Sequence, residues 1–291
     1  MNIGIMGNRT KPELSSVVQV LLKSLEDREV HIYADGELSE LFASFNHTLK
    51  ITFEPLQKIS SRCDVLLSLG GDGTMLNAAK IVGASGVPIL GVNLGKLGFL
   101  AGISVNELEE TLDELFEGKL ISEERDVLQA TNTHNNERYF ALNDIVLDKG
   151  NAFRLIEIDC FVNKEFLGSY SADGLIVATS TGSTAYSMAC GGPIIIPSCD
   201  SIVLTPISPH NLASRPVVIS TQSTIQLHVR QSDFPAHLAA DGQSNHFFPS
   251  PVEIIISAAP YRIQFLQKQN YNYFETLRAK LMWGRRYAKP L

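Results

Sequence analysis

The sequence predicts an α/β N-terminal domain with a parallel sheet, a β-rich, sandwich-like C-terminal domain, and a C-terminal helix packing back on the first domain. Up to about residue 118, strand-like apolar runs alternate with segments of helical spacing, which is typical of βαβ units. From about residue 121, short β-rich runs separated by turn residues replace that alternation. The tail is again helical in pattern. These changes place the two domains at residues 1–120, joined by the tail 265–291, and at residues 121–264.

The elements of the first domain follow from apolar spacing. Leu14, Val17 and Leu21 share one helical face, whereas residues 64–69 are almost all apolar, as in a central parallel strand. In chain order we expect strands at 2–6, 29–33, 64–69 and 88–93, helices at 12–26, 75–82 and 106–117, and a short helix or loop at 38–45. Ligands of parallel sheets bind at the carboxyl ends of the strands. The glycine-rich turns at 70–74 and 93–98 both fall at that end.

The second domain consists of short β-rich runs. Turn signals such as Asn135-Asn136 and Asp241-Gly242 separate them, which favours antiparallel pairing. The expected strands are 124–133, 138–147, 155–162, 174–178, 201–207, 216–219, 224–229, 237–240 and 252–256, and the tail helix is 273–283. We expect the two domains to pack closely, with a cleft between them.

Composition narrows the class of protein. The 291 residues are 44% hydrophobic and 19% charged, as in a globular chain with a sizeable core. The net charge is −7 and no dense Lys/Arg block occurs, which argues against nucleic acid and anionic membranes as partners. No basic leader or 18-residue apolar run is present, so we expect neither a signal peptide nor a spanning helix.

The cysteines and histidines give no metal site. The four cysteines lack metal-site spacing and are expected to be reduced thiols of a cytoplasmic protein. The seven histidines are scattered. We therefore predict no metal ion held by protein ligands alone.

A glycine turn carrying one carboxylate follows the strand at 64–69. It reads Gly70-Gly71-Asp72-Gly73-Thr74. Its glycines let the backbone approach a ligand, and amides ahead of a helix form an anion site suited to phosphate. A carboxylate there makes sense if it binds a hydroxyl or a metal ion beside the phosphates. The structural alternative is a tight turn in which Asp72 caps the helix.

A second stretch combines a strand with a run of hydroxyl and glycine residues. Residues 179–184 follow the strand 174–178, and Tyr186 comes shortly after them. The hydroxyls and amides suit a polar ligand, and Tyr186 offers a ring for packing against a base. The alternative is a Ser/Thr-rich surface loop.

Two polar residues, Asn143 and Asp144, interrupt an apolar run, where such side chains must find partners. The alternative is a strand edge or bulge. Downstream, Asp241-Gly242-Gln243 is a turn signal first and a ligand contact only by association.

Taken together, these motifs resemble the bacterial NAD kinases of the ATP-NAD kinase family. That family shares its glycine motif with diacylglycerol kinases and 6-phosphofructokinases. The resemblance is carried, in the family's order, by Gly70–Thr74, Gly91–Leu100, Leu142–Asp144, Asp173–Val177 with Thr181–Ser187, Gly191–Ile194, and Thr205–His210 through Arg215-Pro216. It runs from about residue 64 to the tail, while the first 60 residues match only in outline.

The resemblance implies ATP-dependent phosphorylation of the adenosine-ribose 2′-hydroxyl of NAD to NADP, with a divalent metal such as Mg²⁺. It implies that the second domain binds NAD and that the chain forms homodimers or homotetramers. The general base falls on Asp72, within the nucleotide-binding turn Gly70, Gly71, Asp72, Gly73 and Thr74. NAD contacts fall on Gly73, Asn143, Asp144, Asp173, Thr184, Ala185, Tyr186, Ser187, Met188 and Ala189, and further ones on Arg154 and Gln243.

Two other functions share some of these features. A lipid kinase of the diacylglycerol type has the same glycine motif, but the hydroxyl run and the motif at 91–100 suit a dinucleotide better. A non-catalytic dinucleotide sensor would not need Asp72. The sequence leaves open whether polyphosphate also donates, whether NAD or NADH is preferred, and which oligomer forms.

Overall fold

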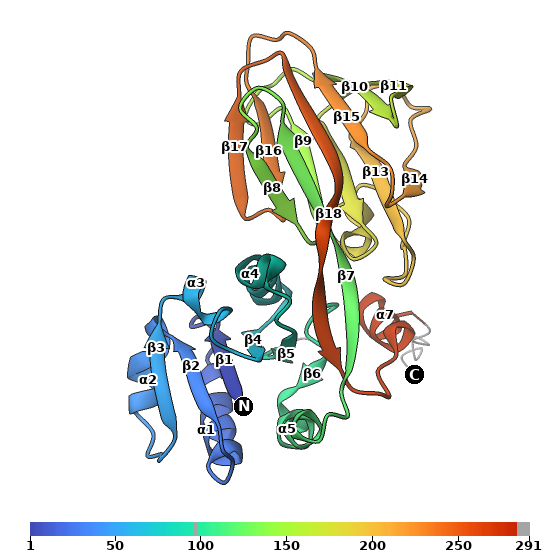
Figure 1. Ribbon diagram of the computed structural model, residues 1–291. Helices are drawn as coiled ribbons and strands as arrows, with labels where there is room; N and C mark the ends of the chain where they lie inside the picture. Colours follow the sequence, from blue (N-terminus) through green and yellow to red (C-terminus); the bar gives the residue numbers. More distant parts are fainter. Residues whose placement is uncertain (96–97, 284–291) are drawn as a thin grey trace, which may run out of the picture. The chain divides into compact units, whose positions relative to one another are not determined.

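The computed structural model describes residues 1–95 and 98–283, which form two compact units (Figure 1). Unit 1 is Met1–Glu124 together with the chain from Ile263 onwards, and unit 2 is Arg125–Arg262. The unit boundaries fall inside strands β7 (Ile121–Asn132) and β18 (Val252–Gln267). Each of these strands therefore contributes residues to both units.

Unit 1 is built of alternating strands and helices. Its strands are β1 (Asn2–Gly7), β2 (His31–Asp35), β3 (Lys50–Glu54), β4 (Val65–Gly70), β5 (Ile89–Asn93) and β6 (Ile103–Ser104). Its helices are α1 (Leu14–Leu25), α2 (Ser39–Ala43), α3 (Leu56–Ile59), α4 (Asp72–Val82), α5 (Leu108–Phe116) and α7 (Tyr273–Leu281). Within the described ranges, no helix is long and apolar enough to cross a membrane.

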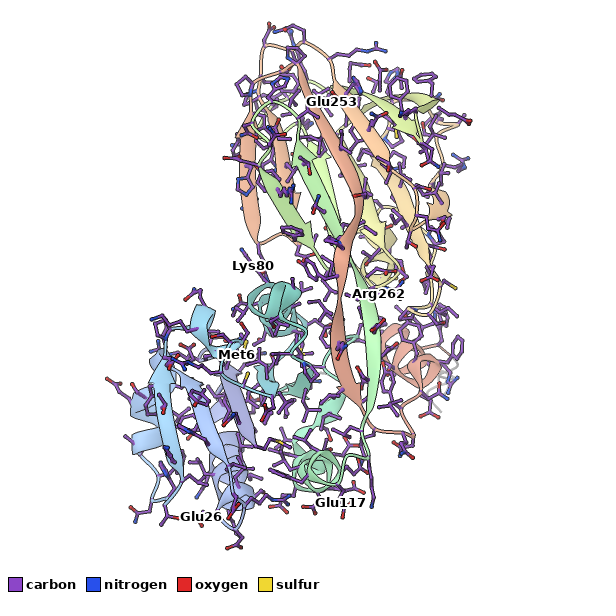
Figure 2. All side chains as sticks on the ribbon, in the orientation of Figure 1. Met6, Glu26, Lys80, Glu117, Glu253 and Arg262 are labelled. Atoms are coloured by element: carbon purple, nitrogen blue, oxygen red, sulfur yellow. The ribbon has the colours of Figure 1, made fainter. Side chains whose placement is uncertain are left out.

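The sheet of unit 1 is parallel, with the strand order β3-β2-β1-β4-β5 and the end of β18 beside β5. From β1 the chain first adds strands on one side, then crosses back to place β4 on the other side. β1 and β4 thus flank a topological switch point, where open α/β sheets bind ligands. Figure 2 labels Met6 near the carboxyl end of β1.

Helices cover both faces of this sheet. On one face, α1 and α5 pack against buried strand residues such as Ile5, Leu67 and Val92. On the other face, Ile59 of α3 lies against Gly4, and Met75 of α4 lies against Gly91. Each fully buried aliphatic side chain in such a core contributes about 1.5–3 kcal/mol to folding.

Unit 2 is an antiparallel sandwich. Its strands, besides its parts of β7 and β18, are β8 (Arg138–Ala141), β9 (Asp144–Asp148), β10 (Ile156–Val162), β11 (Glu165–Ala172), β12 (Gly174–Thr179), β13 (Ser201–Ile207), β14 (Val217–Ser220), β15 (Ile225–Val229), β16 (Ala236–Ala240) and β17 (Ser244–Phe248). One sheet has the order β11-β10-β15-β18, and the other has the order β14-β13-β12-β9-β16-β17. Among its described residues a 3-10 turn, Gly182–Thr184, precedes the one α-helix, the short α6 (Tyr186–Ala189).

The two sheets of unit 2 enclose one core and leave a second layer outside. Alternate residues such as Leu147, Leu175 and Ile254 fill the space between the sheets. On the outer face of the β9–β12–β13–β16 sheet, Val146 and Ile176 pack with residues of the 190–199 segment, including Ile195. The candidate site of this unit lies on that outer face.

The predicted fold class is confirmed: unit 1 has the parallel sheet, unit 2 is β-rich, and α7 returns to unit 1. Four strands were missed: the sheet-edge strands β3, β11 and β17, and the two-residue β6. The expected strand 138–147 is two strands, β8 and β9, because residues 142 and 143 leave the ladder. The expected strand 252–256 is the start of the 16-residue β18.

Candidate active site

The glycine turn connects β4 directly to α4. Asp72 is the first residue of the helix, and Gly71 is the N-cap. The amides of Thr74 and Met75 donate to the Gly71 carbonyl oxygen at 2.9 and 3.1 Å. The turn therefore presents its backbone at the carboxyl edge of the sheet, next to the switch point.

The Asp72 carboxylate does not cap its own helix. Its Oδ2 accepts a hydrogen bond from the Phe99 amide and its Oδ1 one from the Leu100 amide, both at 3.0 Å. Lys280 of α7 places Nζ 4.0 Å from Oδ2 and 5.4 Å from the centre of the Phe99 ring. The capping interpretation is thus wrong, and the two amides fix the orientation of the carboxylate.

The glycines around this carboxylate serve different purposes. A Cβ at Gly98 would collide with Oδ1 of Asp72, and one at Gly70 would collide with Thr74. At Gly71 and Gly73, by contrast, no atom lies within 4 Å of the position that a Cβ would take. The protein itself does not require glycine there for space, so the open backbone suits the close approach of a ligand.

In unit 2, Asp241 holds the Asn143-Asp144 segment. Its carboxylate accepts hydrogen bonds from the amides of Leu142, Asn143 and Asp144 at 2.8, 2.7 and 3.1 Å. The Asp241 amide in turn donates to the Asp144 carbonyl oxygen at 3.0 Å. Asn143 and Asp144, the polar residues that interrupt the apolar run, are thus held by a residue of the β16–β17 turn, far along the chain.

Asp144 is itself a buried acid, with 5% of its surface exposed. Burial, and then the charge of Asp241, raise the pKa of the Asp144 carboxyl to about 7. The group therefore changes its charge close to neutral pH. At that pH it is able both to donate and to accept hydrogen bonds.

These residues line a cavity of about 340 Å³ within unit 2. The Tyr186 ring, with 45% of the residue exposed, lies at its edge. The complete lining is Asn143, Asp144, Val146, Asp148, Ala185, Tyr186, Ala239, Asp241 and Gly242. The structure thus brings together four of the expected contacts: Asn143, Asp144, Ala185 and Tyr186.

The hydroxyl run is not a surface loop, because residues 179–184 are all buried. The Thr179 hydroxyl donates to the Leu142 carbonyl oxygen at 2.6 Å, and a Cβ at Gly182 would collide with the Asn143 backbone. Ser187 is also buried and lies 2.8 Å from the hydroxyl of Thr205. Much of this run therefore supports the cavity from behind.

The other expected contacts lie around or away from the cavity. Asp173 pairs with Lys149 at 2.6 Å. Burial raises the pKa of the Tyr186 phenol, and the charge of Asp173 adds a small part to that shift. The Arg154 side chain is 82% exposed and 3.5 Å from Asp233. Gln243 is exposed in the β16–β17 turn. Thr184 is buried, Met188 is half-buried and Ala189 is exposed. Roles for these residues stay predictions.

Sequence reasoning missed one acid of the cavity, Asp148, and the main role of a second, Asp241. Asp148 ends β9 and lies 2.9 Å from Nδ1 of His237, on the neighbouring strand β16. Asp241 was interpreted first as a turn residue and as a ligand contact only by association, and its hold on the Asn143-Asp144 segment was not predicted. The alternation of β9, which puts Asp144, Val146 and Asp148 on one face, was the available signal for Asp148.

Asp144 gives a prediction about stability and pH. The folded-state pKa of about 7 lies above the ordinary value of about 4, so the folded chain holds a proton that the unfolded chain has lost. The stability from this group is fully present below about pH 4 and is lost as the pH rises to about 7. We expect Asp144→Asn, which cannot ionise, to reduce the fall in melting temperature between pH 5 and pH 8.

The control is Asp27→Asn, because Asp27 is an exposed acid. This variant should follow the melting curve of the unsubstituted protein at both pH values. Parallel pH profiles for Asp144→Asn and the unsubstituted chain would show that the buried acid does not titrate as described.

Comparison with known proteins gives the same family for both units. The family model described as ATP-NAD kinase N-terminal domain matches residues 3–120, and that described as ATP-NAD kinase C-terminal domain matches residues 142–268. An NAD kinase of Azotobacter vinelandii is 38% identical over 290 residues, covering 98% of this chain and 97% of that protein.

Solved structures agree in fold. Yeast NADH kinase complexed with NADH has a TM-score of 0.92 at 27% identity, covering 100% of this chain and 90% of that one. An NAD kinase from Archaeoglobus fulgidus in complex with ATP has a TM-score of 0.76, covering 96% and 99% of the two chains. At 24% identity the latter supports the fold alone. With nearly full-length relatives above 30% identity, the chain belongs to the ATP-NAD kinase family of enzymes.

Proposed function

We propose that this kinase transfers the γ-phosphoryl group of ATP to the adenosine-ribose 2′-hydroxyl of NAD, with Asp72 as the general base. The observation that carries the proposal is the orientation of the Asp72 carboxylate. Asp72 lies in a glycine turn whose backbone is open at Gly71 and Gly73, and the amides of Phe99 and Leu100, from another loop, hold its carboxylate. A ribose hydroxyl is a weak nucleophile, and phosphoryl transfer depends mainly on alignment and charge stabilisation. An oriented carboxylate aligns the hydroxyl and accepts its proton, while backbone amides of the turn offset the charge of the phosphates.

In the proposed step, the 2′-oxygen bonds to the γ-phosphorus while the bond from that phosphorus to the β–γ bridging oxygen breaks. The hydroxyl proton passes to Asp72, and ADP leaves. For this transfer the hydroxyl must come within about 2.6–3.2 Å of a carboxylate oxygen. The bonds from Phe99 and Leu100 use one lone pair on each oxygen, which leaves the others for the hydroxyl.

The family's divalent metal fits these residues as an ion shared with the nucleotide. Among residues 1–95 and 98–283, no group of three metal-ligating side chains occurs. Mg²⁺ is usually held by one or two carboxylates together with substrate phosphates and water. Asp72 is the carboxylate at the turn that would take this part, and the bound ion would offset phosphate charge.

The cavity of unit 2 supports binding of the dinucleotide. Asn143 and Asp144 offer hydrogen-bonding groups to a ribose or base, and the half-exposed Tyr186 offers a ring for stacking. Asp173, Thr184, Ser187, Met188 and Ala189, as well as Arg154 and Gln243, are proposed as further contacts or supports. Assembly as a homodimer or homotetramer remains a prediction.

The experiment is incubation of the protein with NAD, ATP and Mg²⁺, followed by product identification. We expect NADP, detected with a dehydrogenase that accepts only NADP and located at the 2′-position by phosphorus NMR. Binding of NAD without an ATP-dependent product would favour the sensor alternative. Phosphorylation of diacylglycerol in a parallel reaction would favour a lipid kinase.

A further inference from the structure

One lysine of unit 1 lies next to the proposed base. Lys280 of α7 places Nζ 4.0 Å from Oδ2 of Asp72, and the two side chains are 29% and 35% exposed. This distance is too long for a hydrogen bond but short enough for an ion pair. Within the part of the chain that the structure describes, Asp72 is the only acid at ion-pair distance from Lys280. The ammonium group therefore faces the carboxylate that takes part in the proposed step.

The packing of α7 fixes the position of this lysine. Thr276 and Leu277 are the buried residues of the helix, and Lys280 follows them by four and three residues, so all three lie on one face. Tyr273, one turn before them, has its ring centre 6.5 Å from that of Phe99. Lys280 thus belongs to the packed face of α7, although it lies in the last turn of the helix.

Phe99 connects the lysine to the base. Its amide donates to Oδ2 of Asp72 at 3.0 Å, and Nζ of Lys280 lies over its ring, 5.4 Å from the ring centre. A cation over an aromatic face at such a distance is attracted to the ring. The same residue therefore holds the carboxylate through its backbone and the ammonium group through its side chain.

The separation of the two charges leaves the base accessible. The amides of Phe99 and Leu100 use one lone pair on each oxygen of Asp72. Because Lys280 makes no third hydrogen bond to these oxygens at 4.0 Å, the substrate hydroxyl still finds an acceptor. A fixed cation beside reacting oxygens is an arrangement that stabilises charge developing in a transition state.

The alternative is a purely structural role. A cation in the last turn of a helix interacts favourably with the helix dipole, and a partly exposed ion pair contributes little more. Arg278 has such a role, since it lies 3.9 Å from Glu275 of the same helix and its side chain is 55% exposed. Lys280 differs from Arg278 because its partner, Asp72, belongs to another element and is the acid of the glycine turn.

The proposed reaction changes the charges around Lys280. As the 2′-oxygen bonds to the γ-phosphorus, the hydroxyl proton passes to Asp72, the carboxylate becomes a neutral acid, and ADP leaves. Lys280 thereby loses its anionic partner in the same step that creates a phosphate on the 2′-oxygen. That oxygen starts within about 2.6–3.2 Å of the carboxylate, so the new phosphate forms within reach of the flexible lysine side chain.

We propose that Lys280 is a further catalytic residue: its ammonium group binds the phosphoryl group as it arrives on the 2′-oxygen, and then holds the 2′-phosphate of the product. The inference rests on the proposed function, which places the hydroxyl at Asp72. Rotation about the side-chain bonds of Lys280 carries the ammonium group from the carboxylate to the phosphate without movement of α7. The ligand of this site is thus a phosphate monoester on the ribose of the acceptor.

The test compares the binding of NAD and NADP without a phosphoryl donor, by calorimetry. Lys280→Met keeps an apolar stem over Phe99 and removes the charge. We expect it to weaken NADP by about tenfold or more, the worth of a hydrogen bond to a charged group, and to change Kd for NAD by less than about twofold. Lys280→Arg should retain most of the NADP affinity. The matched control Arg278→Met, which removes a cation from the same helix, should change neither Kd.

Turnover gives a second readout. Lys280→Met should lower kcat for NADP formation by about 10²-fold, since the loss of one donor at a developing charge costs about that factor. KM for NAD should change little. Asp72→Asn resembles the neutral acid left by the reaction, so it should bind NADP more tightly than the unsubstituted protein does.

The outcomes separate this inference from the proposed function. Equal weakening of NAD and NADP in Lys280→Met, or an unchanged Kd for NADP, would overturn the assignment. A lower melting temperature with an unchanged ratio of the two Kd values would likewise show that Lys280 is only structural. If no NADP forms from NAD and ATP while the affinity for NADP still depends on Lys280, the proposed function is wrong and the 2′-phosphate site stands.

Discussion

Asp72→Asn is expected to lower kcat for NADP formation by about 10²–10⁴-fold, which is the usual contribution of a general base. The amide side chain has nearly the same shape but cannot take the hydroxyl proton. KM for NAD should change little, because all but one of the expected NAD contacts besides Asp72 lie on unit 2. Steady-state kinetics with saturating ATP measure both quantities.

The substitution also has a structural cost that must be separated from the kinetic effect. The asparagine oxygen accepts only one of the two amides, from Phe99 or Leu100, that the carboxylate now serves. An amide left without an acceptor costs about 1–3 kcal/mol, so a lower melting temperature is expected. Circular dichroism at the assay temperature confirms that the variant is folded. Near-normal turnover in a folded Asp72→Asn protein would remove Asp72 as the base.

Gly98→Ala is expected to lose most activity although Asp72 remains in place. The new methyl group would collide with Oδ1 of Asp72 and push the carboxylate off the Phe99 and Leu100 amides. A carboxylate out of line with the attacking hydroxyl loses the advantage of orientation. The effect on kcat should therefore approach that of Asp72→Asn.

A double variant shows whether the two changes act through one group. If Gly98→Ala works by displacing Asp72, adding it to Asp72→Asn should lower kcat little further, since residues acting as a unit are not additive. The control is Gly168→Ala, because no atom lies within 4 Å of a Cβ at Gly168. Independent, multiplicative losses in the double variant would show that Gly98 acts elsewhere.

Local patterns predicted the elements that depend on local chemistry. The apolar run of β4 and the helical spacing of α1 identified the core of unit 1, because a helix that buries one face has apolar residues at regular intervals in its sequence. The edge strand β3 had no such pattern, since only part of its residues face the core. Likewise, the helix expected from residue 75 begins at Asp72. Gly73 lies in its first turn, and because glycine is unfavourable in helices, the sequence pattern did not indicate a helix there.

The sites were predictable as motifs but not as contacts. Asp72 stood out as an acid among glycines, yet its amide partners Phe99 and Leu100 come from another loop. Asp241 holds the Asn143-Asp144 segment from nearly a hundred residues away, and Lys280 reaches Asp72 from α7, far along the chain. Pairings of this kind depend on the tertiary fold, which a single sequence does not record.

Because unit 1 is formed from two separate stretches of sequence, its folding can be completed only after both have been synthesised. Residues 125–262 form one unit and leave the ribosome as a block, whereas unit 1 also needs the segment from Ile263 onwards, which is made after that block. That segment brings Phe265, which pairs beside Ile89 at the sheet edge, and Lys280, which lies 4.0 Å from Asp72. Unit 1 is thus completed only after unit 2 has emerged, and Asp72 acquires its full surroundings only once the segment from Ile263 onwards has been made.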